Sequence, residues 1–291
     1  MIILSGKDIA KKIQTQIRHY SIDYFKSHKE YPKLAVVLVG NDPASLIYIK
    51  HKRKACSECN IDTELHHLPD NVSFQTLKLL INQLNDDSEV HGILVQFPLS
   101  DHIDVNELVH LIAPEKDVDG FGPANLGGAW MGKPTLTSCT PKGIIKILDE
   151  YKIDIASKHA VMIGRSNIVG KPMAGLLLSR DATVTIVHSK TKNIEDLVKM
   201  GDIVIVAVGS PQLVKKSWLK KGAVVIDVGI NRIEKEDRCE ILGDVDIEGL
   251  EGHISAITPV PGGVGPMTIV SLLQNVVTAA FSQQGKSIEF E

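Results

Sequence analysis

Short apolar runs alternate with amphipathic segments along most of this chain, and this alternation constrains the fold more than any other feature. The runs are rich in β-branched residues and lie at 33–40, 90–99, 159–164, 182–189, 202–209 and 223–231. Segments with helical periodicity, such as 73–84 and 105–114, lie between them. Continuous apolar strands that alternate with helices are typical of parallel sheets covered on both faces. The sequence therefore predicts an α/β fold with a mostly parallel sheet.

A stretch rich in glycine, proline, threonine and serine, residues 120–143, interrupts the alternation. Such composition is typical of loops and linkers, so we expect two domains. The chain closes with a Pro/Gly loop and a long helix that is too apolar for a surface, and we expect this helix to pack against the first domain. The predicted boundaries are 1–120 plus 268–291 for the first domain and 140–267 for the second, with 121–139 as a linker or cleft-lining segment.

Composition excludes several classes of protein. The formal net charge is −3, whereas a general nucleic-acid binder is strongly basic. The N-terminus lacks the pattern of a signal peptide, and no run of 18 uninterrupted apolar residues occurs. We therefore expect a cytoplasmic protein without a membrane span. Cys56 and Cys59 form a C-x-x-C that suits a redox pair or half of a zinc site, but no second pair exists, so we predict buried structural cysteines and no metal.

The basic stretch "IYIKHKRK" at 47–54 contains one lysine that differs from the rest. At helical spacing, Tyr48 and Lys52 share a face with Ser45 and the two cysteines. The other cations, Lys50, His51, Arg53 and Lys54, point the other way. An outward charged face is typical of a solvated helix, and a regulator that contacts RNA through these cations is the alternative.

Residues 161–180 combine a buried strand, a glycine turn and a helix. The turn has the spacing Gly164-x-Ser166-x-x-x-Gly170, which departs from G-x-G-x-x-G. Glycine turns also serve packing alone, but a strand, turn and helix in this order favour a Rossmann-like site with nucleotide phosphates at the helix N-terminus.

The residues after the next strand indicate which nucleotide is bound. An NAD site places a carboxylate there to hold the ribose hydroxyls, whereas this chain has Ser189 and Lys190. Arg165 in the glycine turn adds a second cation. Cations and hydroxyls suit a 2′-phosphate, so we predict NADP as the cofactor; solvated surface charges are the alternative interpretation.

Polar residues in the first half mark a second candidate site. Gln96 ends the buried run at 90–99, while Asp117 and Asp119 precede a glycine. An amide at the carboxyl end of a buried strand is well placed for a cleft. Each residue also has a structural interpretation, because amides cap strands and aspartates collect in turns.

Six segments together resemble a known family. They are "VGNDPAS…YIKHKRKAC" (39–56), "VQFPL" (95–99), "PEKDVDGF" (114–121), "IGRSNIVGKPMA" (163–174), "HSKT" (188–191) and "TPVPGGVGPMT" (258–268). In this order and spacing they closely resemble the bifunctional methylenetetrahydrofolate dehydrogenase/methenyltetrahydrofolate cyclohydrolase family, from about residue 4 to residue 282. The resemblance implies two α/β domains, the second Rossmann-like, with the active site in the cleft between them, and a homodimer.

The resemblance also implies roles for individual residues. Lys52 matches the catalytic lysine, with Tyr48 positioning it and Gln96 orienting it, and Asp119 matches the folate-binding aspartate. The cofactor positions are Gly164, Arg165, Ser166, Ser189 and Ile230, and Pro261 and Gly265 flank the substrate. Three positions depart from the family's usual pattern, namely Asn60, Phe97 and Ser138. Phe97 is the one able to alter folate contacts.

The implied reaction has two steps in one-carbon metabolism. NADP takes a hydride from 5,10-methylenetetrahydrofolate, and the methenyl product is then hydrolysed to 10-formyltetrahydrofolate. A lysine at its ordinary pKa near 10.4 is a poor base at neutral pH, so the second step implies a desolvated amine. The alternatives are a dehydrogenase-only or NAD-dependent member of the family and, more remotely, a non-catalytic nucleotide-binding regulator.

Overall fold

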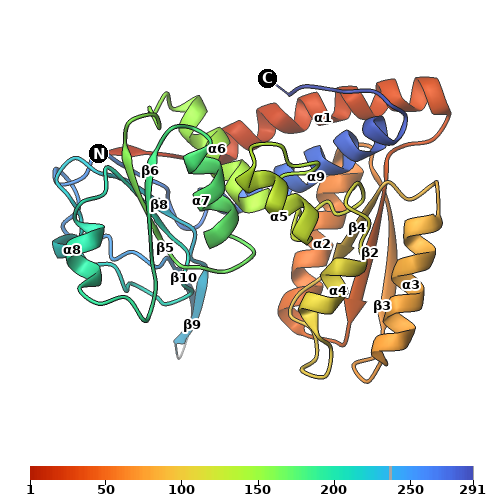
Figure 1. The fold of residues 1–291 in the computed structure, drawn as a ribbon, viewed down its shortest axis with the longest axis horizontal. Helices are drawn as coiled ribbons and strands as arrows, with labels where there is room; N and C mark the ends of the chain where they lie inside the picture. The colour runs from red at the N-terminus through yellow and green to blue at the C-terminus, as the bar shows by residue number, and fades with distance from the viewer. Residues whose placement is uncertain (236–237, 291) are drawn as a thin grey trace. The chain divides into compact units, whose positions relative to one another are not determined.

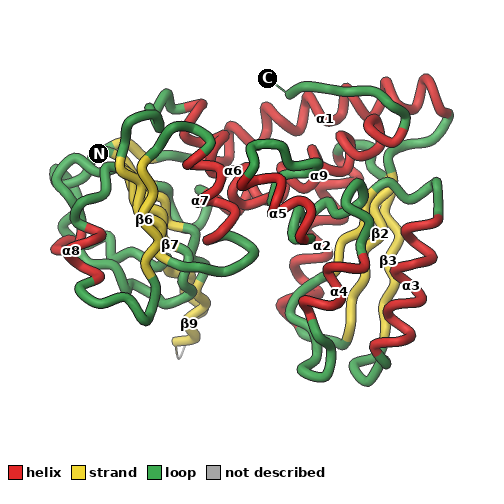
Figure 2. Tube along the Cα trace, in the orientation of Figure 1, coloured by secondary structure: helices red, strands yellow, loops and turns green. Residues whose placement is uncertain are grey.

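The chain forms two compact units in a computed structural model that describes residues 1–235 and 238–290 (Figure 1). Unit 1 comprises Met1–Ala10, Ala129–Lys133 and Thr140–Thr268, and unit 2 comprises Lys11–Gly128, Pro134–Cys139 and Ile269–Glu291. Each unit has its own parallel sheet flanked by helices, as the colouring of Figure 2 shows. The predicted α/β class with a mostly parallel sheet is confirmed.

Unit 2 is built on a three-stranded parallel sheet in the order β3-β2-β4. Its strands are β2 (Lys33–Val39), β3 (Asp62–Leu68) and β4 (Gly92–Val95), and its helices include α2 (Pro43–Glu58), α3 (Phe74–Asp86) and α4 (Val105–Leu111). Side chains of β2 and β4 pack with those of α3 in one buried apolar cluster. Because β2 is central and buried on both faces, its sequence "KLAVVLV" is apolar without alternation.

Strand β3 lacks the continuous apolar sequence of the central strand β2. Its sequence "DTELHHL" is mostly polar, and its residues are partly or largely exposed. An edge strand has a neighbour on one side only, so its burial does not demand a continuous apolar run. The sequence analysis placed no strand between α2 and α3, and the structure corrects this.

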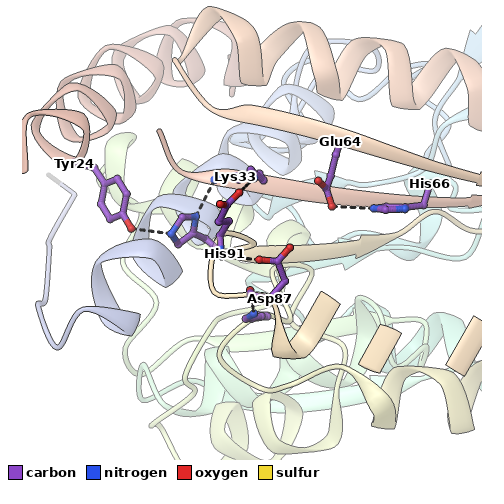
Figure 3. Close-up of polar contacts among 8 residues, drawn as sticks. Tyr24, Lys33, Glu64, His66, Asp87 and His91 are labelled. Atoms are coloured by element: carbon purple, nitrogen blue, oxygen red, sulfur yellow. Dashed lines mark hydrogen bonds and ion pairs between the residues drawn. The ribbon is translucent and has the colours of Figure 1, made fainter. Parts of the chain in front are cut away.

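A buried histidine joins helix α1 (Gly6–His28) to the start of this sheet (Figure 3). His91 accepts a hydrogen bond at Nδ1 from the backbone N–H of Lys33, at 3.0 Å. Its Nε2 lies 2.7 Å from the hydroxyl of Tyr24 on α1, and Nε2 therefore carries the proton and donates it. Burial, followed by the nearby cations of Lys116 and Lys33, lowers the pKa of His91 to about 4. The ring is thus a neutral structural link at neutral pH.

Unit 1 contains a six-stranded parallel sheet in the order β1-β11-β8-β7-β5-β6. The strands are β1 (Ile2–Ile3), β5 (His159–Ile163), β6 (Thr183–Val187), β7 (Ile203–Val206), β8 (Val224–Asp227) and β11 (Ala256–Ile257). Its helices are α6 (Cys139–Glu150), α7 (Gly170–Leu178), α8 (Ile194–Val198) and a 3-10 turn at Lys216–Trp218. Strand β9 (Asn231–Lys235) pairs antiparallel with β10 (Arg238–Leu242). The chain passes from β5 to β6 on one side and then to β7 on the other, so the strand order reverses between β5 and β7.

Two expected boundaries differ from the observed units. The first ten residues belong to unit 1, because β1 pairs with β11 and the amide of Leu4 donates to the carbonyl of Ile257. The segment 121–139 is not merely a loop, since it contains α5 (Pro123–Trp130) and the start of α6. Glycines at 127 and 128 disfavour a helix by local propensity. Contacts from outside the helix support it, because Asn125 donates to the Asp117 carboxylate and accepts from the backbone amide of Leu136, at 2.9 Å each.

Helix α9 (Val264–Gln283) is the long apolar helix at the end of the chain. On length and composition it could cross a membrane, but most of it is buried within the protein, which is typical of a core helix. From Ile269 onward it belongs to unit 2, where the side-chain nitrogen of Asn275 donates to the backbone carbonyls of Val118 and Thr137 at 2.8 Å each.

Candidate active site

The start of helix α2 is anchored beside the end of strand β4. Asp42 caps its start by accepting from the amide of Ser45 at 2.7 Å, and the Ser45 hydroxyl donates to the carbonyl of Phe97 at 3.3 Å. Beyond its end, Asn60 adopts a left-handed φ of +55°, a conformation that asparagine tolerates better than most residues other than glycine. The helix is therefore held in a defined register against the strand that carries Gln96.

Lys52 and Gln96 form a direct pair within unit 2. The Lys52 ammonium donates to the side-chain oxygen of Gln96 at 3.1 Å. The amide nitrogen of Gln96 donates to the carbonyl of Phe97 at 2.7 Å, which orients its oxygen toward the lysine. Gln96 is 8% exposed, and Lys52 is half-buried. The other cations of the stretch, Lys50, His51, Arg53 and Lys54, are all exposed, so Lys52 is the distinct lysine that the helical spacing predicts.

Tyr48 lies differently from the expectation of a shared inward face. It is 46% exposed, while the buried positions of α2 are Ser45, Ile49, Ala55 and Cys56. Tyr48 therefore lies at the margin of the inward face, one turn before Lys52. A ring at that position is accessible to a bound molecule, and Lys52 lies at the boundary between the core and this accessible surface.

The two aspartates of "DVDG" have different environments. Asp117 is 2% exposed, and its carboxylate accepts from the amides of Gly120, Phe121 and Gly122 and from Asn125, at 2.7–3.2 Å. The three backbone donors belong to its own loop and Asn125 belongs to the following helix α5, so Asp117 shapes the loop and ties it to that helix. This geometry supports the structural interpretation for Asp117, in which an aspartate stabilises its own turn through local hydrogen bonds.

Asp119 has the features of a ligand-binding carboxylate. Burial raises its pKa to about 6, with the positive charge of Lys52 acting in the opposite direction and the negative charge of Asp117 adding to the rise. Within the described parts of the chain, its side chain has no hydrogen-bond or ion-pair partner, although it stays partly accessible. A carboxylate that lies in the electric field of Lys52 and has free acceptor positions is able to accept hydrogen bonds from a pair of N–H donors on a ligand.

Lys116 is a residue that the sequence analysis missed. It is 5% exposed, and its ammonium donates to three carbonyls at the end of α3: Leu84 at 3.0 Å, Asn85 at 2.7 Å and Asp87 at 2.6 Å. A cation at a helix C-terminus satisfies carbonyls that lack partners within the helix. Lys116 therefore ties the loop of Asp117 and Asp119 to a helix some thirty residues earlier, a contact that local sequence patterns do not reveal.

The glycine turn of unit 1 requires glycine at two positions. Gly164 follows β5 with φ of +123°, and a Cβ there would lie 2.4 Å from the carbonyl oxygen of Ala207. A Cβ at Gly170 would lie 2.5 Å from the carbonyl oxygen of Gly164. The Ser166 hydroxyl accepts from the amide of Val169 at 3.1 Å and so holds the turn before α7. The turn is a compact one at the end of a central strand, as the sequence predicts.

The cationic positions lie at the ends of neighbouring strands. Arg165 follows β5, while Ser189 and Lys190 follow β6, which pairs with β5 in parallel. All three side chains are exposed, and the turn after β6 is closed within itself by His188, whose amide donates to the Thr191 hydroxyl at 3.0 Å. Two unburied cations, a hydroxyl and no carboxylate fit the 2′-phosphate of NADP and do not fit the paired ribose hydroxyls of NAD.

The remaining predicted positions also belong to unit 1. Ile230 follows β8 and is 48% exposed, and a Cβ at Gly265 would make an ordinary contact with it at 3.7 Å. Pro261 is an exposed residue of the loop after β11. The structure thus gathers Lys52, Gln96 and Asp119 in unit 2, and places the cofactor positions with Pro261 and Gly265 in unit 1.

Comparison with known proteins identifies both units. Residues 4–119 match the tetrahydrofolate dehydrogenase/cyclohydrolase catalytic domain, and residues 138–284 match the NAD(P)-binding domain of the same family. The chain is 48% identical over 278 residues to the bifunctional protein FolD of Acetivibrio thermocellus, with 96% of each chain covered. It is 50% identical over 281 residues to FolD 2 of Pseudomonas syringae, with 97% of this chain and 93% of the relative covered.

Solved structures agree with these sequence matches. The FolD dehydrogenase/cyclohydrolase of Campylobacter jejuni superposes with a TM-score of 0.92 at 47% identity, covering 96% of this chain and 98% of the other. The Trypanosoma brucei FolD, solved with NADP and an inhibitor, gives a TM-score of 0.93 at 35% identity, covering 99% of each chain. The chain belongs to the tetrahydrofolate dehydrogenase/cyclohydrolase family.

Proposed function

We infer that this chain is a bifunctional folate enzyme. It oxidises 5,10-methylenetetrahydrofolate to 5,10-methenyltetrahydrofolate with NADP, and it hydrolyses the product to 10-formyltetrahydrofolate. Matches to both family domains and near-complete coverage of relatives named as bifunctional support this conclusion. The single observation that carries it is the hydrogen-bonded pair of half-buried Lys52 and buried Gln96, because hydrolysis needs a proton-transfer group that plain hydride transfer does not.

In this proposal each unit binds a different molecule. Unit 2 binds the folate and contains the proton-transfer group, and unit 1 binds NADP along the carboxyl ends of β5, β6 and β8. When bound, NADP accepts the hydride that leaves the methylene carbon. Arg165, Ser189 and Lys190 supply the charge and hydroxyl for its 2′-phosphate, and Ser166 with the Gly164 turn shapes the phosphate side. The chain's contribution to oxidation is thus binding and orientation.

Asp119 anchors the pterin ring. Its carboxylate has free acceptor positions and accepts the paired N–H donors of the ring, a geometry that also selects the orientation of the folate. The nearby ammonium of Lys52 favours the ionised form of Asp119 against the effect of burial. Tyr48, exposed one turn before Lys52, contacts the ring face, and Phe97 lies beside this site with its ring 6.3 Å from that of Phe121.

Lys52 transfers protons during hydrolysis. Water adds to the methenyl carbon, and the resulting ring opening needs a proton removed from oxygen and one delivered to nitrogen. The Gln96 oxygen fixes one N–H of the lysine, so the amine faces a single direction instead of sampling many rotamers. Gln96 is itself held by the Phe97 carbonyl, and this makes it a positioning residue for Lys52.

We propose that the protein acts as a cytoplasmic homodimer and contacts neither membrane nor nucleic acid. The free edge of β3 leaves backbone groups along one side of the unit 2 sheet available to a second copy. Sedimentation of the purified protein tests the assembly, and a titration with RNA at physiological salt tests the exposed basic face of α2.

One spectrophotometric assay tests the reaction. Methylenetetrahydrofolate is supplied with NADP and, separately, with NAD, and both the reduced nucleotide and the methenyl chromophore are followed. We expect reduced nucleotide to form with NADP and the methenyl signal to stay low because hydrolysis removes it. Accumulation of the methenyl compound without decay would show a dehydrogenase alone, and equal rates with NAD would contradict the assigned cofactor.

A further inference from the structure

The loops after β7 and β8 form part of the cofactor edge of unit 1. The strand order reverses between β5 and β7, and ligands of open parallel sheets bind outside the carboxyl ends of strands at such a point. The Gly164 turn lies on one side of this point, and residues 208–210, directly after β7, lie on the other. The two sides touch, because a Cβ at Gly164 would be 2.4 Å from the carbonyl oxygen of Ala207.

A buried aspartate holds the loop after β7. Asp244 is fully buried, and its Oδ2 accepts from the amides of Val208 at 2.8 Å and Gly209 at 3.0 Å. Its Oδ1 accepts from the amide of Ser210 at 2.9 Å. Three successive amides thus point away from solvent toward one carboxylate, although Val208 and Gly209 are themselves exposed. The loop's path is set by this carboxylate.

The same carboxylate also holds the loop after β8. The side-chain nitrogen of Asn231 donates to Oδ1 of Asp244 at 2.9 Å, and Asn231 directly follows the cofactor position Ile230. Gly229, on the other side of Ile230, comes so close that a Cβ there would lie 2.3 Å from the Asp244 carboxyl carbon. Asp244 therefore connects two loops that come from adjacent strands.

A second buried aspartate supports Asp244 in turn. Asp227, at the end of β8, accepts from the amides of Asp244, Val245 and Gly229 at 2.9–3.0 Å. A Cβ at Gly243 would lie 1.9 Å from the Asp227 carboxylate, so the segment 243–245 is pressed directly against it. The position of the Asp244 side chain is determined by the sheet itself and not by a flexible loop.

We propose that Asp244 is the positioning residue for the nicotinamide half of NADP. The adenosine half belongs to the β5 and β6 side, where Gly164, Arg165 and Ser189 lie, and this leaves the nicotinamide half to the loops after β7 and β8. Asp244 does not touch the cofactor; it fixes residues 208–210 and Ile230 so that the ring meets a preformed surface. The proposal rests on the assignment of NADP to this sheet edge.

Asp244→Asn tests this role with little change of volume. Whichever way the amide is turned, its NH2 group faces two N–H donors, so two of the four hydrogen bonds are lost. We expect the affinity for NADP, measured by calorimetry, to fall roughly 10- to 100-fold, the usual range for buried donors left unsatisfied. Adenosine 2′,5′-diphosphate, which represents the adenosine half alone, should bind as in the wild type.

The matched control is Asp246→Asn, two residues away. Asp246 is partly exposed and paired with Lys215 at 3.0 Å, so the variant makes the same charge change without touching residues 208–210 or 229–231. It should retain wild-type affinity for both NADP and the diphosphate. Should Asp244→Asn fail to yield folded protein, Asn231→Ala removes one of the four bonds and should weaken NADP binding severalfold while leaving the diphosphate unaffected.

Each outcome decides between explanations. Unchanged NADP affinity in a folded Asp244→Asn or Asn231→Ala variant would overturn the proposal. An equal loss of NADP and diphosphate affinity would also overturn it, because Asp244 would then support the whole unit and not one half of the site. If the wild-type protein bound neither nucleotide, the proposed function itself would fail, and this result is distinct from the other two.

Discussion

The two units hold their functional groups by different means. In unit 2 the side chain that we propose to transfer protons is held by another side chain, as Gln96 holds Lys52 at 3.1 Å. In unit 1 the loops of the proposed cofactor site are held through their backbone. Glycines allow close backbone contacts, and buried carboxylates such as Asp244 accept hydrogen bonds from the loop amides. Proton transfer needs one group at one point, whereas a dinucleotide needs an extended surface of amides and small residues. The difference in construction follows from the difference in task.

Both units nevertheless use a buried aspartate that collects backbone amides. Asp117 accepts from three amides of its own loop in unit 2, and Asp244 accepts from three amides of another loop in unit 1. The first is a local turn, and the second joins segments more than thirty residues apart. A carboxylate is suited to both because its two oxygens accept several donors at once.

The largest effect is expected from Lys52→Met. We expect cyclohydrolase activity to fall by about 10²- to 10⁴-fold, the usual contribution of a general acid or base, while hydride transfer to NADP stays measurable. The assay follows methenyltetrahydrofolate hydrolysis and nucleotide reduction separately. Lys50→Met, an exposed lysine of the same helix, is the control and should behave as the wild type. Normal hydrolysis in Lys52→Met would show that Lys52 is not the proton-transfer group of unit 2.

Asp117→Asn should impair both activities. The substitution sets an NH2 group against the amides of Gly120, Phe121 or Gly122 and so disturbs the loop that carries Asp119. We expect kcat/KM for both reactions to fall by about 30- to 100-fold, since charge-assisted hydrogen bonds contribute about 2–3 kcal/mol. Exposed Glu115→Gln is the charge-matched control. Loss of dehydrogenase activity alone would contradict a folate site shared by both reactions.

Lowering the pH should destabilise unit 2 through His91 and stabilise unit 1 through Asp227. Burial lowers the pKa of His91 to about 4, below the ordinary value of 6.5, so the unfolded state binds the proton first and stability falls as pH drops below 6.5. At pH 5 this costs about 2 kcal/mol, or about thirtyfold in local opening. Burial raises the pKa of Asp227 to about 6, so the folded state binds the proton first and stability rises as pH drops below 6.

Hydrogen exchange measured at pH 7 and pH 5, corrected for intrinsic rates, separates these effects. Amides of β2 and β4 beside His91 should lose more protection than those of β7 and β8 beside Asp227. The His91→Phe variant is the control: it should be less stable than the wild type at pH 7, because Tyr24 and the Lys33 amide lose their partner, and the gap should narrow toward pH 5. Equal changes in both sheets would contradict the assigned pKa directions.

The smallest effect is expected from Arg165→Ala. Loss of one exposed cation beside a 2′-phosphate should raise the KM for NADP by about tenfold, and it should leave the KM for NAD nearly unchanged. Lys199→Ala, an exposed lysine beyond α8, controls for net charge. Equal effects on both nucleotides would place Arg165 away from the phosphate and would contradict the assignment of the 2′-phosphate to the β5 and β6 side of the cofactor edge.

Much of the site could be predicted because local spacing determines it. Four-residue spacing separates Lys52 from the outward cations of α2, and a strand followed by Gly164 and Gly170 indicates the glycine turn whatever the rest of the chain does. Strand β3 could not be predicted in this way, since an edge position tolerates "DTELHHL". The exposure of Tyr48 could not be predicted, because helical spacing gives the direction of a side chain but not how far neighbouring elements cover it.

The sequence alone determined the α/β class, the glycine turn, the distinct lysine and the lack of an NAD-type carboxylate, because each depends on residues close together in the chain. The tertiary structure decided which carboxylate is free and which residues hold the site. Asp117 and Asp119 are indistinguishable by spacing, and their different roles follow from the donors around each. Lys116 and Asp244 act on segments about thirty residues away, and only folding brings a buried charge to the backbone groups that satisfy it.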